Sequence, residues 1–255
     1  MQLDPFAAAA GFQLIVHDTI NSTNTEACAM ARAGQRGPLW IVAREQTAGR
    51  GRRGNSWISE PGNLYASLLL PDVPPGRAGD LAFVAAVAVR DAVGALAPGI
   101  AFHLTLKWPN DVQVGNAKIA GILIEAENSW AVIGIGINCA HHPAQMPNVT
   151  DLKSSGIAVS VEQLFAALSK HMLLRLQQWE MGKGFAAIRD DWLDACSGVG
   201  YPILVRLPTQ ELTGKFENID DKGHLMLRLR DGRIETIAAG EVFGLEHGGQ
   251  AQVAR

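Results

Sequence analysis

The sequence is organised around one nine-residue stretch, Gly49-Arg50-Gly51-Arg52-Arg53-Gly54-Asn55-Ser56-Trp57. Its glycines let the backbone adopt positive φ angles and approach a ligand closely. Its arginines carry planar forks of donors that suit carboxylate and phosphate oxygens. Trp57 adds a flat apolar ring of the kind that stacks on a heterocycle such as adenine. The stretch therefore predicts a loop that folds over an anionic, nucleotide-like ligand and excludes water from it.

Two other interpretations of this loop are a solvated basic loop and an Arg/Gly segment that binds nucleic acid nonspecifically. The composition of the chain argues against the second. Lys and Arg number 22 against 25 Asp and Glu, so the formal net charge is −3. Because a nucleic-acid-binding protein normally carries an excess of positive charge, no specific DNA binding is expected. A basic loop in a nearly neutral chain favours a small anionic ligand.

Length and composition set the class of protein. The chain has 255 residues and is 47% hydrophobic, which suits one large domain or a medium domain with a small appendage. Cys28, Cys139 and Cys196 are widely spaced and odd in number, so neither a disulfide framework nor a cysteine metal site is expected. The N-terminus lacks the basic region of a signal peptide, and no run reaches the ~18 apolar residues that span a bilayer. The sequence predicts a cytoplasmic protein without membrane partners.

The first part of the chain mixes strands and helices without regular βαβ alternation. Strands are expected over residues 12–17, 39–44, 63–70, 102–108, 118–127 and 131–137, and helices over residues 23–33, 80–96, 160–180 and 185–195. Thr23 and Glu26 fit a capping box at the start of the first helix. Alternation in the strand over 102–108 predicts a buried face made of Phe102, Leu104, Leu106 and Trp108, and Pro109 with Asn110-Asp111 is expected to end it.

The pattern changes after Gly198. Short strands are expected over residues 201–207, 211–218, 224–230 and 233–237, with turns at Asp220-Asp221-Lys222-Gly223 and Asp231-Gly232. This spacing is typical of a small all-β unit of the SH3-like barrel kind. We therefore expect a catalytic domain over residues 1–198, a β domain over 199–247 and a disordered tail over 248–255.

Five polar clusters fall at expected strand ends or loops. They are Ser22-Thr23-Asn24, Gln46 with the glycine–arginine loop, Lys107-Trp108-Pro109-Asn110-Asp111, Lys118-Ile119-Ala120-Gly121 and Gly134-Ile135-Gly136-Ile137-Asn138. The last lacks the third glycine of a dinucleotide-binding motif, so a strand that admits close approach of a ligand fits better. Lys107 and Lys118 lie in strongly apolar strands, where a charge needs a partner. Simpler roles stay open: Asp111 in a turn, Thr23 as a helix cap, and Trp57 in the core.

Taken together and in this order, the clusters resemble the catalytic core of biotin protein ligases, over most of residues 12–245. The motifs that carry the resemblance are Ser22-Thr23-Asn24, GRGRRGNSW at 49–57, KWPND at 107–111, KIAGIL at 118–123 and GIGIN at 134–138. The resemblance implies an α+β fold like that of class II aminoacyl-tRNA synthetases, a mixed sheet flanked by helices, followed by an SH3-like β domain. It also implies a two-step ligase reaction: biotin and Mg-ATP give biotinyl-5′-AMP, and a carrier lysine then takes the biotin.

The resemblance also implies roles for individual residues. Those expected to bind biotin are Ser22, Thr23, Asn24, Gln46, Gly49, Arg50, Trp57, Lys118, Gly121, Gly134 and Gly136. Those expected to bind ATP or the adenylate are Arg50, Arg52, Arg53, Trp57, Lys107, Asn110, Asp111 and Asn138. Lys118, Arg52 and Asp111 are the expected catalytic residues, with Asp111 also facing Mg²⁺. The glycine at 121 is expected to let the backbone approach biotin.

The resemblance also implies a partner protein, and other functions remain open. The expected acceptor is a biotin carboxyl carrier protein or domain of the acetyl-CoA carboxylase type, and the chain is expected to be a monomer or a homodimer. The first catalytic strand starts near Phe12, so no N-terminal DNA-binding domain and no repressor role are expected. Asn55 stands where many relatives carry a basic residue, so fewer phosphate contacts are expected there. The alternatives are a lipoate or octanoate ligase or transferase of the same fold, a nucleic-acid-binding protein, and a biotin-binding pseudoenzyme.

Overall fold

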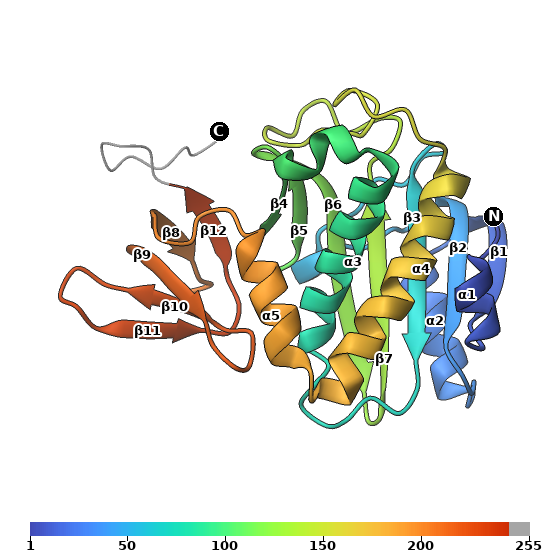
Figure 1. Ribbon diagram of the computed structural model, residues 1–255, viewed down its shortest axis with the longest axis horizontal. Coiled ribbons are helices and arrows are strands. Elements are labelled where there is room, and N and C mark those ends of the chain that lie inside the picture. The colour runs from blue at the N-terminus through green and yellow to red at the C-terminus, as the bar shows by residue number, and fades with distance from the viewer. Residues whose placement is uncertain (245–255) are drawn as a thin grey trace.

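A computed structural model describes residues 1–244 of the chain, in two sheets (Figure 1). The tail expected over 248–255, and the last residues of the expected β domain, lie outside this range. The larger sheet has seven strands in the order β1-β2-β3-β7-β6-β5-β4. They are β1 (Gln13–Ile20), β2 (Leu39–Gln46), β3 (Leu64–Leu70), β4 (Leu104–Lys107), β5 (Asp111–Val114), β6 (Ala117–Glu127) and β7 (Trp130–Ile137). Only β1 and β2 run parallel; the other neighbours are antiparallel.

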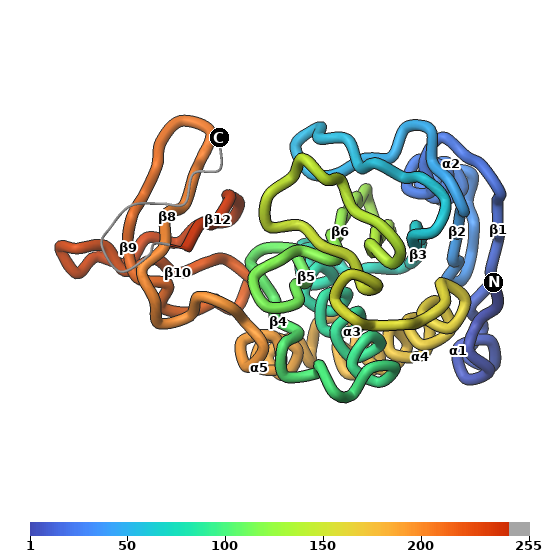
Figure 2. Tube along the Cα trace, turned by 90° about the horizontal axis from the view of Figure 1, so that it is seen from above, coloured from blue at the N-terminus to red at the C-terminus, as the bar shows by residue number. Residues whose placement is uncertain are grey.

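Helices cover both faces of this sheet. One face carries α1 (Pro5–Ala9), α3 (Asp80–Leu96), α4 (Val161–Trp179) and α5 (Phe185–Asp194), and α2 (Thr23–Arg32) packs on the other (Figures 1 and 2). Helix α3 is apolar all round and mostly buried, because α4 and the sheet enclose it. The part of the chain that contains the larger sheet also has three short 3₁₀ turns. They are η1 (Arg52–Gly54), η2 (Pro98–His103) and η3 (Glu180–Gly182). Within residues 1–244, no helix has the length and apolar character needed to cross a bilayer.

The second sheet is antiparallel and has five strands in the order β11-β10-β9-β8-β12. They are β8 (Pro202–Arg206), β9 (Glu211–Ile219), β10 (Leu225–Arg228), β11 (Ile234–Ile237) and β12 (Glu241–Gly244). The expected fold class, a mixed sheet flanked by helices plus a small β unit, is confirmed. The sequence did not predict β12, because the four residues Glu241–Gly244 carry too short a pattern.

The two sheets share one hydrophobic core. Buried side chains of the second sheet, among them Phe216 and Leu225, belong to the same cluster as the core beneath the first sheet. The buried Trp108 indole donates a hydrogen bond to the carbonyl of Gly223 at 3.1 Å. The division into domains at residue 198 therefore stays a prediction, and the two parts are bonded tightly to each other.

Gly223 is a conformational constraint at this junction. It has a φ of +81°, and a Cβ at this position would lie 2.7 Å from Cε2 of Phe83. Gly223→Ala is expected to lower the free energy of unfolding by about 2–4 kcal/mol, through left-handed strain and overpacking combined. Gly232→Ala is the matched control, because its φ is +87° and a Cβ there meets nothing within 4 Å. Urea unfolding measures both, and equal losses in the two variants would contradict the packing argument.

Three local expectations are corrected by the structure. The N-cap of α2 is Ser22, whose hydroxyl accepts from the amide of Thr25 at 3.4 Å, whereas Thr23 lies inside the helix and points to the sheet. Phe102 is 96% exposed, because the η2 turn carries it to solvent before β4 begins. Strand β4 ends at Lys107, before Pro109 as expected, but the chain re-enters the sheet at once. Asp111 starts β5, a strand that was not expected, and pairs there with Lys107 on one side and Gly121 on the other.

Candidate active site

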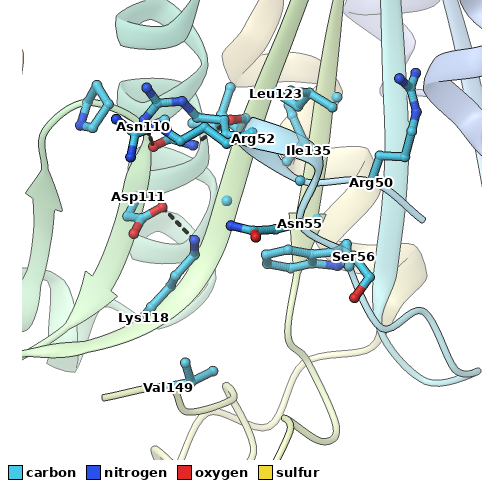
Figure 3. Close-up of a pocket in the computed structure, with 18 of the residues that line it drawn as sticks. Arg50, Arg52, Asn55, Ser56, Asn110, Asp111, Lys118, Leu123, Ile135 and Val149 are labelled. Carbon is cyan, nitrogen blue, oxygen red and sulfur yellow. Dashed lines mark hydrogen bonds and ion pairs between the residues drawn. The ribbon is translucent and has the colours of Figure 1, made fainter. Parts of the chain in front are cut away.

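A cavity of about 540 Å³ opens between the larger sheet, the loop that contains η1, and β12 of the second sheet (Figure 3). All but one of the site residues expected from the sequence line it. They are Ser22, Thr23, Asn24, Gln46, Arg50, Arg52, Arg53, Trp57, Lys107, Asn110, Asp111, Lys118, Gly121, Gly134, Gly136 and Asn138. Segments that lie far apart in the sequence thus converge on one cleft.

Gly49 is the exception. It packs at the base of the loop, where a Cβ would collide with the hydroxyl of Ser59 and the carbonyl of Trp57. The amide of Trp57 donates to the carbonyl of Gly49 at 2.9 Å, which closes the loop as a narrow hairpin. The structure thus gives Gly49 a role in loop closure and does not bring it to the cavity.

One wall of the cavity is apolar and flat. The Trp57 ring lies over β6 and β7 at two glycines: a Cβ on Gly121 would be 2.9 Å from the ring, and one on Gly136 would be 2.5 Å from it. Gly134 likewise makes room for the side chain of Asn24. In this structure the space above Gly121 holds the indole and the Lys118 side chain. The buried indole nitrogen of Trp57 has no hydrogen-bond partner within residues 1–244.

A second wall is polar and neutral, at the start of α2 and the end of β2. Oε1 of Gln46 accepts from the amide of Thr23 at 2.8 Å and from its hydroxyl at 3.1 Å. Nε2 of Gln46 donates to the hydroxyl of Ser59 at 2.9 Å, which in turn donates to the carbonyl of Trp57 at 2.8 Å. The Gln46 amide is therefore fixed in one orientation. Hydroxyl and amide groups held in this way suit a small ligand that both donates and accepts hydrogen bonds.

The opposite end of the cavity is positively charged. Nζ of Lys118 lies 2.6 Å from Oδ1 of Asp111, and Nη1 of Arg52 donates to Oδ1 of Asn110 at 3.0 Å (Figure 3). Arg53 lies nearby and pairs with Glu241 of β12 at 3.2 Å. Sequence reasoning expected a partner for Lys118, and Asp111 is that partner.

Burial shifts the ionisation of two of the nearby cations. It lowers the pKa of Lys107, while Asp111 acts in the opposite direction. Burial and then the neighbouring Arg53 lower the pKa of Arg52. Burial makes the charged forms of these side chains less stable, and a bound anion would stabilise them again. This end of the cavity is therefore suited to phosphate groups.

Two other expected residues are held by protein groups. Nδ2 of Asn138 donates to the carbonyl of Thr150 at 3.0 Å, and Arg50 pairs with Glu125 at 2.6 Å. The Arg50 side chain lies at a distance from Lys118 and Arg52 (Figure 3). Within residues 1–244, no cluster of three or more His, Cys, Asp or Glu residues could hold a metal ion. Asp111 and Glu241 are the carboxylates that lie among the cations, Asp111 beside Lys118 and Glu241 beside Arg53. One or two carboxylates suit a Mg²⁺ ion that is held largely by phosphate oxygens and water.

Sequence reasoning missed part of the cavity lining. Pro143, Met146 and Val149 come from the long loop before α4, and residues 240–243 come from the second sheet. No motif marks these residues: the loop has no hydrophobic period, and β12 is too short to predict. Glu125 was also missed, since its place near the end of a hairpin is typical of a solvated carboxylate.

Comparisons with known proteins agree with this geometry. Residues 16–140 match the Biotin/lipoate A/B protein ligase family, and residues 199–244 match the Biotin protein ligase C terminal domain. A biotin–[acetyl-CoA-carboxylase] ligase of Paracoccus denitrificans is 42% identical over 236 residues, which cover 88% of this chain and 97% of that protein.

Two solved structures are also similar. The biotin protein ligase of Aquifex aeolicus in complex with biotin and ATP has a TM-score of 0.77 and 26% identity, covering 90% of this chain and 97% of that one. The Leishmania major biotin protein ligase in complex with biotinyl-5-AMP has a TM-score of 0.64 and 25% identity, covering 89% and 99%. The two family matches, and a relative that is 42% identical over 97% of its own length, agree with the residues that line the cleft. The chain therefore belongs to the biotin protein ligase family.

Proposed function

We propose that this chain is a biotin–[acetyl-CoA-carboxylase] ligase. It condenses biotin with ATP to form biotinyl-5′-AMP and then transfers the biotinyl group to a lysine of a biotin carboxyl carrier protein or domain. The observation that carries the proposal is the joining of three surfaces in one cleft: a neutral polar wall, a flat apolar wall and a cluster of cations. These surfaces match the ureido ring, the fused ring system with its chain, and the phosphates, respectively.

The neutral wall is assigned to biotin. Ser22, Thr23 and Gln46 offer hydroxyl and amide groups at fixed positions, and a cyclic urea both donates from nitrogen and accepts at its carbonyl oxygen. Trp57 with Gly121 and Gly136 gives a flat apolar surface beside that wall. This assignment places the biotin carboxylate toward Lys118.

The cationic end is assigned to adenylation. A biotin carboxylate oxygen attacks the α-phosphorus of ATP, an O–P bond forms, and the bond to pyrophosphate breaks. Lys118 and Arg52 lie where they reduce the repulsion between carboxylate and polyphosphate and stabilise the charge that builds at phosphorus. Asp111 would hold Mg²⁺, which supplies further neutralisation of the phosphates when bound. Arg53, Lys107, Asn110 and Asn138 complete the surface around the nucleotide.

The second step needs an acceptor and protection from water. The amine of the carrier lysine attacks the carbonyl carbon of the mixed anhydride, and AMP leaves with the bonding electrons. The loop over residues 49–57 lies beside the cavity and shields this anhydride from hydrolysis. No nucleophile of the enzyme takes part, which agrees with cysteines whose pKa values burial raises.

Transfer to a carrier tests this proposal. Purified protein, ATP, Mg²⁺ and labelled biotin are incubated with the biotin-carrier domain of an acetyl-CoA carboxylase. The label is expected on one lysine of the carrier, and a carrier with that lysine replaced by arginine is the control. Labelling that needs no ATP, or that ignores the lysine replacement, would contradict the two-step reaction.

The shifted pKa of Lys107 predicts a pH dependence. Only the protonated ammonium attracts phosphate, and burial makes this lysine lose its proton at a lower pH than an exposed lysine does. The KM for ATP is therefore expected to begin to rise with pH below the ordinary lysine pKa of about 10.4. Lys107→Arg should flatten this rise, because a guanidinium stays charged throughout. An unchanged alkaline rise in the variant would remove Lys107 from nucleotide binding.

A further inference from the structure

A chain of hydrogen bonds runs behind the neutral wall and ends on a carboxylate that the proposed reaction does not use. Oε2 of Glu125 on β6 accepts from Arg50 at 2.6 Å and from Nδ2 of Asn24 at 2.9 Å. Oδ1 of Asn24 lies 2.5 Å from the hydroxyl of Ser67, which lies 2.7 Å from the hydroxyl of Thr23. Ser67 is fully buried and Asn24 nearly so, so bulk water does not compete for these contacts.

The carboxylate sets the direction of every bond in this chain. An ionised carboxylate only accepts, so Asn24 must turn its NH₂ group to Glu125 and its carbonyl oxygen to Ser67. Ser67 has one proton, and it goes to Asn24. Ser67 therefore offers only a lone pair to Thr23. The Thr23 proton then points into the protein, toward Ser67 or toward Gln46 at 3.1 Å.

We propose that Glu125 and Ser67 are positioning residues that make Thr23 a hydrogen-bond acceptor toward the ligand, and so select a ring that carries N–H. The inference rests on the proposed function, because it concerns recognition of the ureido group. Ser22 complements Thr23: its oxygen already accepts from the amide of Thr25, which leaves its proton as a donor for a carbonyl. An adjacent acceptor and donor match the N–H and C=O of a cyclic urea. The lipoyl ring and the octanoyl chain carry neither group at that end.

Loss of the carboxylate would relax this order. Without an obligatory acceptor at position 125, the Asn24 amide is free to turn over and donate to Ser67. Ser67 would then donate to Thr23 and occupy one of its two lone pairs, which leaves a single, weaker acceptor position for the ligand N–H. The effect should be selective for biotin, because Lys118 and Arg52 share no hydrogen bond with this chain, and Arg50, which pairs with Glu125, lies apart from them (Figure 3).

Glu125→Gln tests the inference against a matched control, Glu127→Gln. Both glutamates lie on the same face of β6 and each pairs with an arginine, Glu127 with Arg32 at 3.0 Å. Glu125→Gln is expected to raise the KM for biotin by about 10- to 100-fold, the range for a hydrogen bond that involves a charged group. The KM for ATP should stay unchanged, and Glu127→Gln should leave both values unchanged. Ser67→Ala should show the same selective effect as Glu125→Gln.

An exchange of charge between neighbours tests the direction of the bonds. Asn24→Asp alone places two carboxylates side by side and should weaken biotin binding. In the double variant Asn24→Asp with Glu125→Gln, the glutamine donates to the new aspartate, and that carboxylate again forces Ser67 to donate its proton. The double variant should bind biotin more tightly than either single variant. If the losses of biotin affinity in the two single variants simply add in the double variant, the proposed direction of the hydrogen bonds is wrong.

The outcomes separate this inference from the proposed function. If the wild-type protein releases pyrophosphate with biotin but Glu125→Gln leaves the KM for biotin unchanged, or raises both KM values equally, the positioning role is wrong and the ligase activity stands. If the wild-type protein does not use biotin at all, the proposed function fails and the inference fails with it.

Discussion

Replacing Lys118 by methionine is expected to lower the rate of biotinyl-AMP formation by about 10²–10³, the usual loss for one preorganised donor at a developing charge. Nζ of Lys118 lies 2.6 Å from Asp111 at the cationic end of the cavity and 5.4 Å from the centroid of the Trp57 ring. Without the Lys118 ammonium, less positive charge separates the biotin carboxylate from the triphosphate of ATP, and the Asp111 carboxylate loses its ion-pair partner. Single-turnover formation of biotinyl-AMP measures the loss directly.

Lys153→Met is the matched control for this experiment, because Lys153 is exposed and does not line the cavity. It should keep the wild-type rate. If Lys118→Met loses less than tenfold in the chemical step while only the KM for ATP changes, Lys118 binds nucleotide without stabilising the transition state. That result would contradict the catalytic role proposed for it.

Arg52→Gly is expected to release biotinyl-AMP into solution. The guanidinium holds the loop to the β4–β5 turn through its hydrogen bond to Asn110 at 3.0 Å, and glycine removes both the contact and the charge. The loop should open more often, so the intermediate dissociates and hydrolyses. The expected result is free biotinyl-AMP in a filtrate that passes no protein, with slower transfer to the carrier.

A graded control separates charge from geometry at this position. Arg52→Lys keeps one positive charge and loses the planar fork, so it should leak less than Arg52→Gly and more than wild type. An intermediate held as tightly by Arg52→Gly as by the wild-type protein would show that Arg52 does not retain it.

The larger elements of the fold were predictable, because their signals are local. Helix α3 begins and ends at the predicted residues 80 and 96, and α4 spans Val161–Trp179, within a residue of the range predicted at each end. Phe102 was predicted wrongly because alternation alone does not show where a 3₁₀ turn gives way to a strand. Strand β12 was missed because it is short and because β8, its neighbour within residues 1–244, lies far away in the sequence.

Much of the cavity lining was predictable from the motifs, apart from Gly49 and the residues of the loop before α4 and of the second sheet, but its internal bonds were not. Polar motifs at strand ends pointed to the cavity lining, and burial of Lys118 in an apolar strand pointed to its need for a partner. That Glu125 holds Arg50 and Asn24 depends on how β6 passes α2 and the loop, which no local pattern records. The same holds for Glu241, which reaches Arg53 from the second sheet.

Biotin-dependent release of pyrophosphate from ATP is the direct assay for the proposed ligase reaction. The purified protein is assayed with biotin, lipoate and octanoate in parallel, without any carrier protein. The account predicts release with biotin and none with the other two acids, since only biotin fits the paired donor and acceptor at Ser22 and Thr23. Release with lipoate or octanoate in place of biotin would keep the fold and contradict the substrate, and no release with any of the three would contradict the ligase reaction itself.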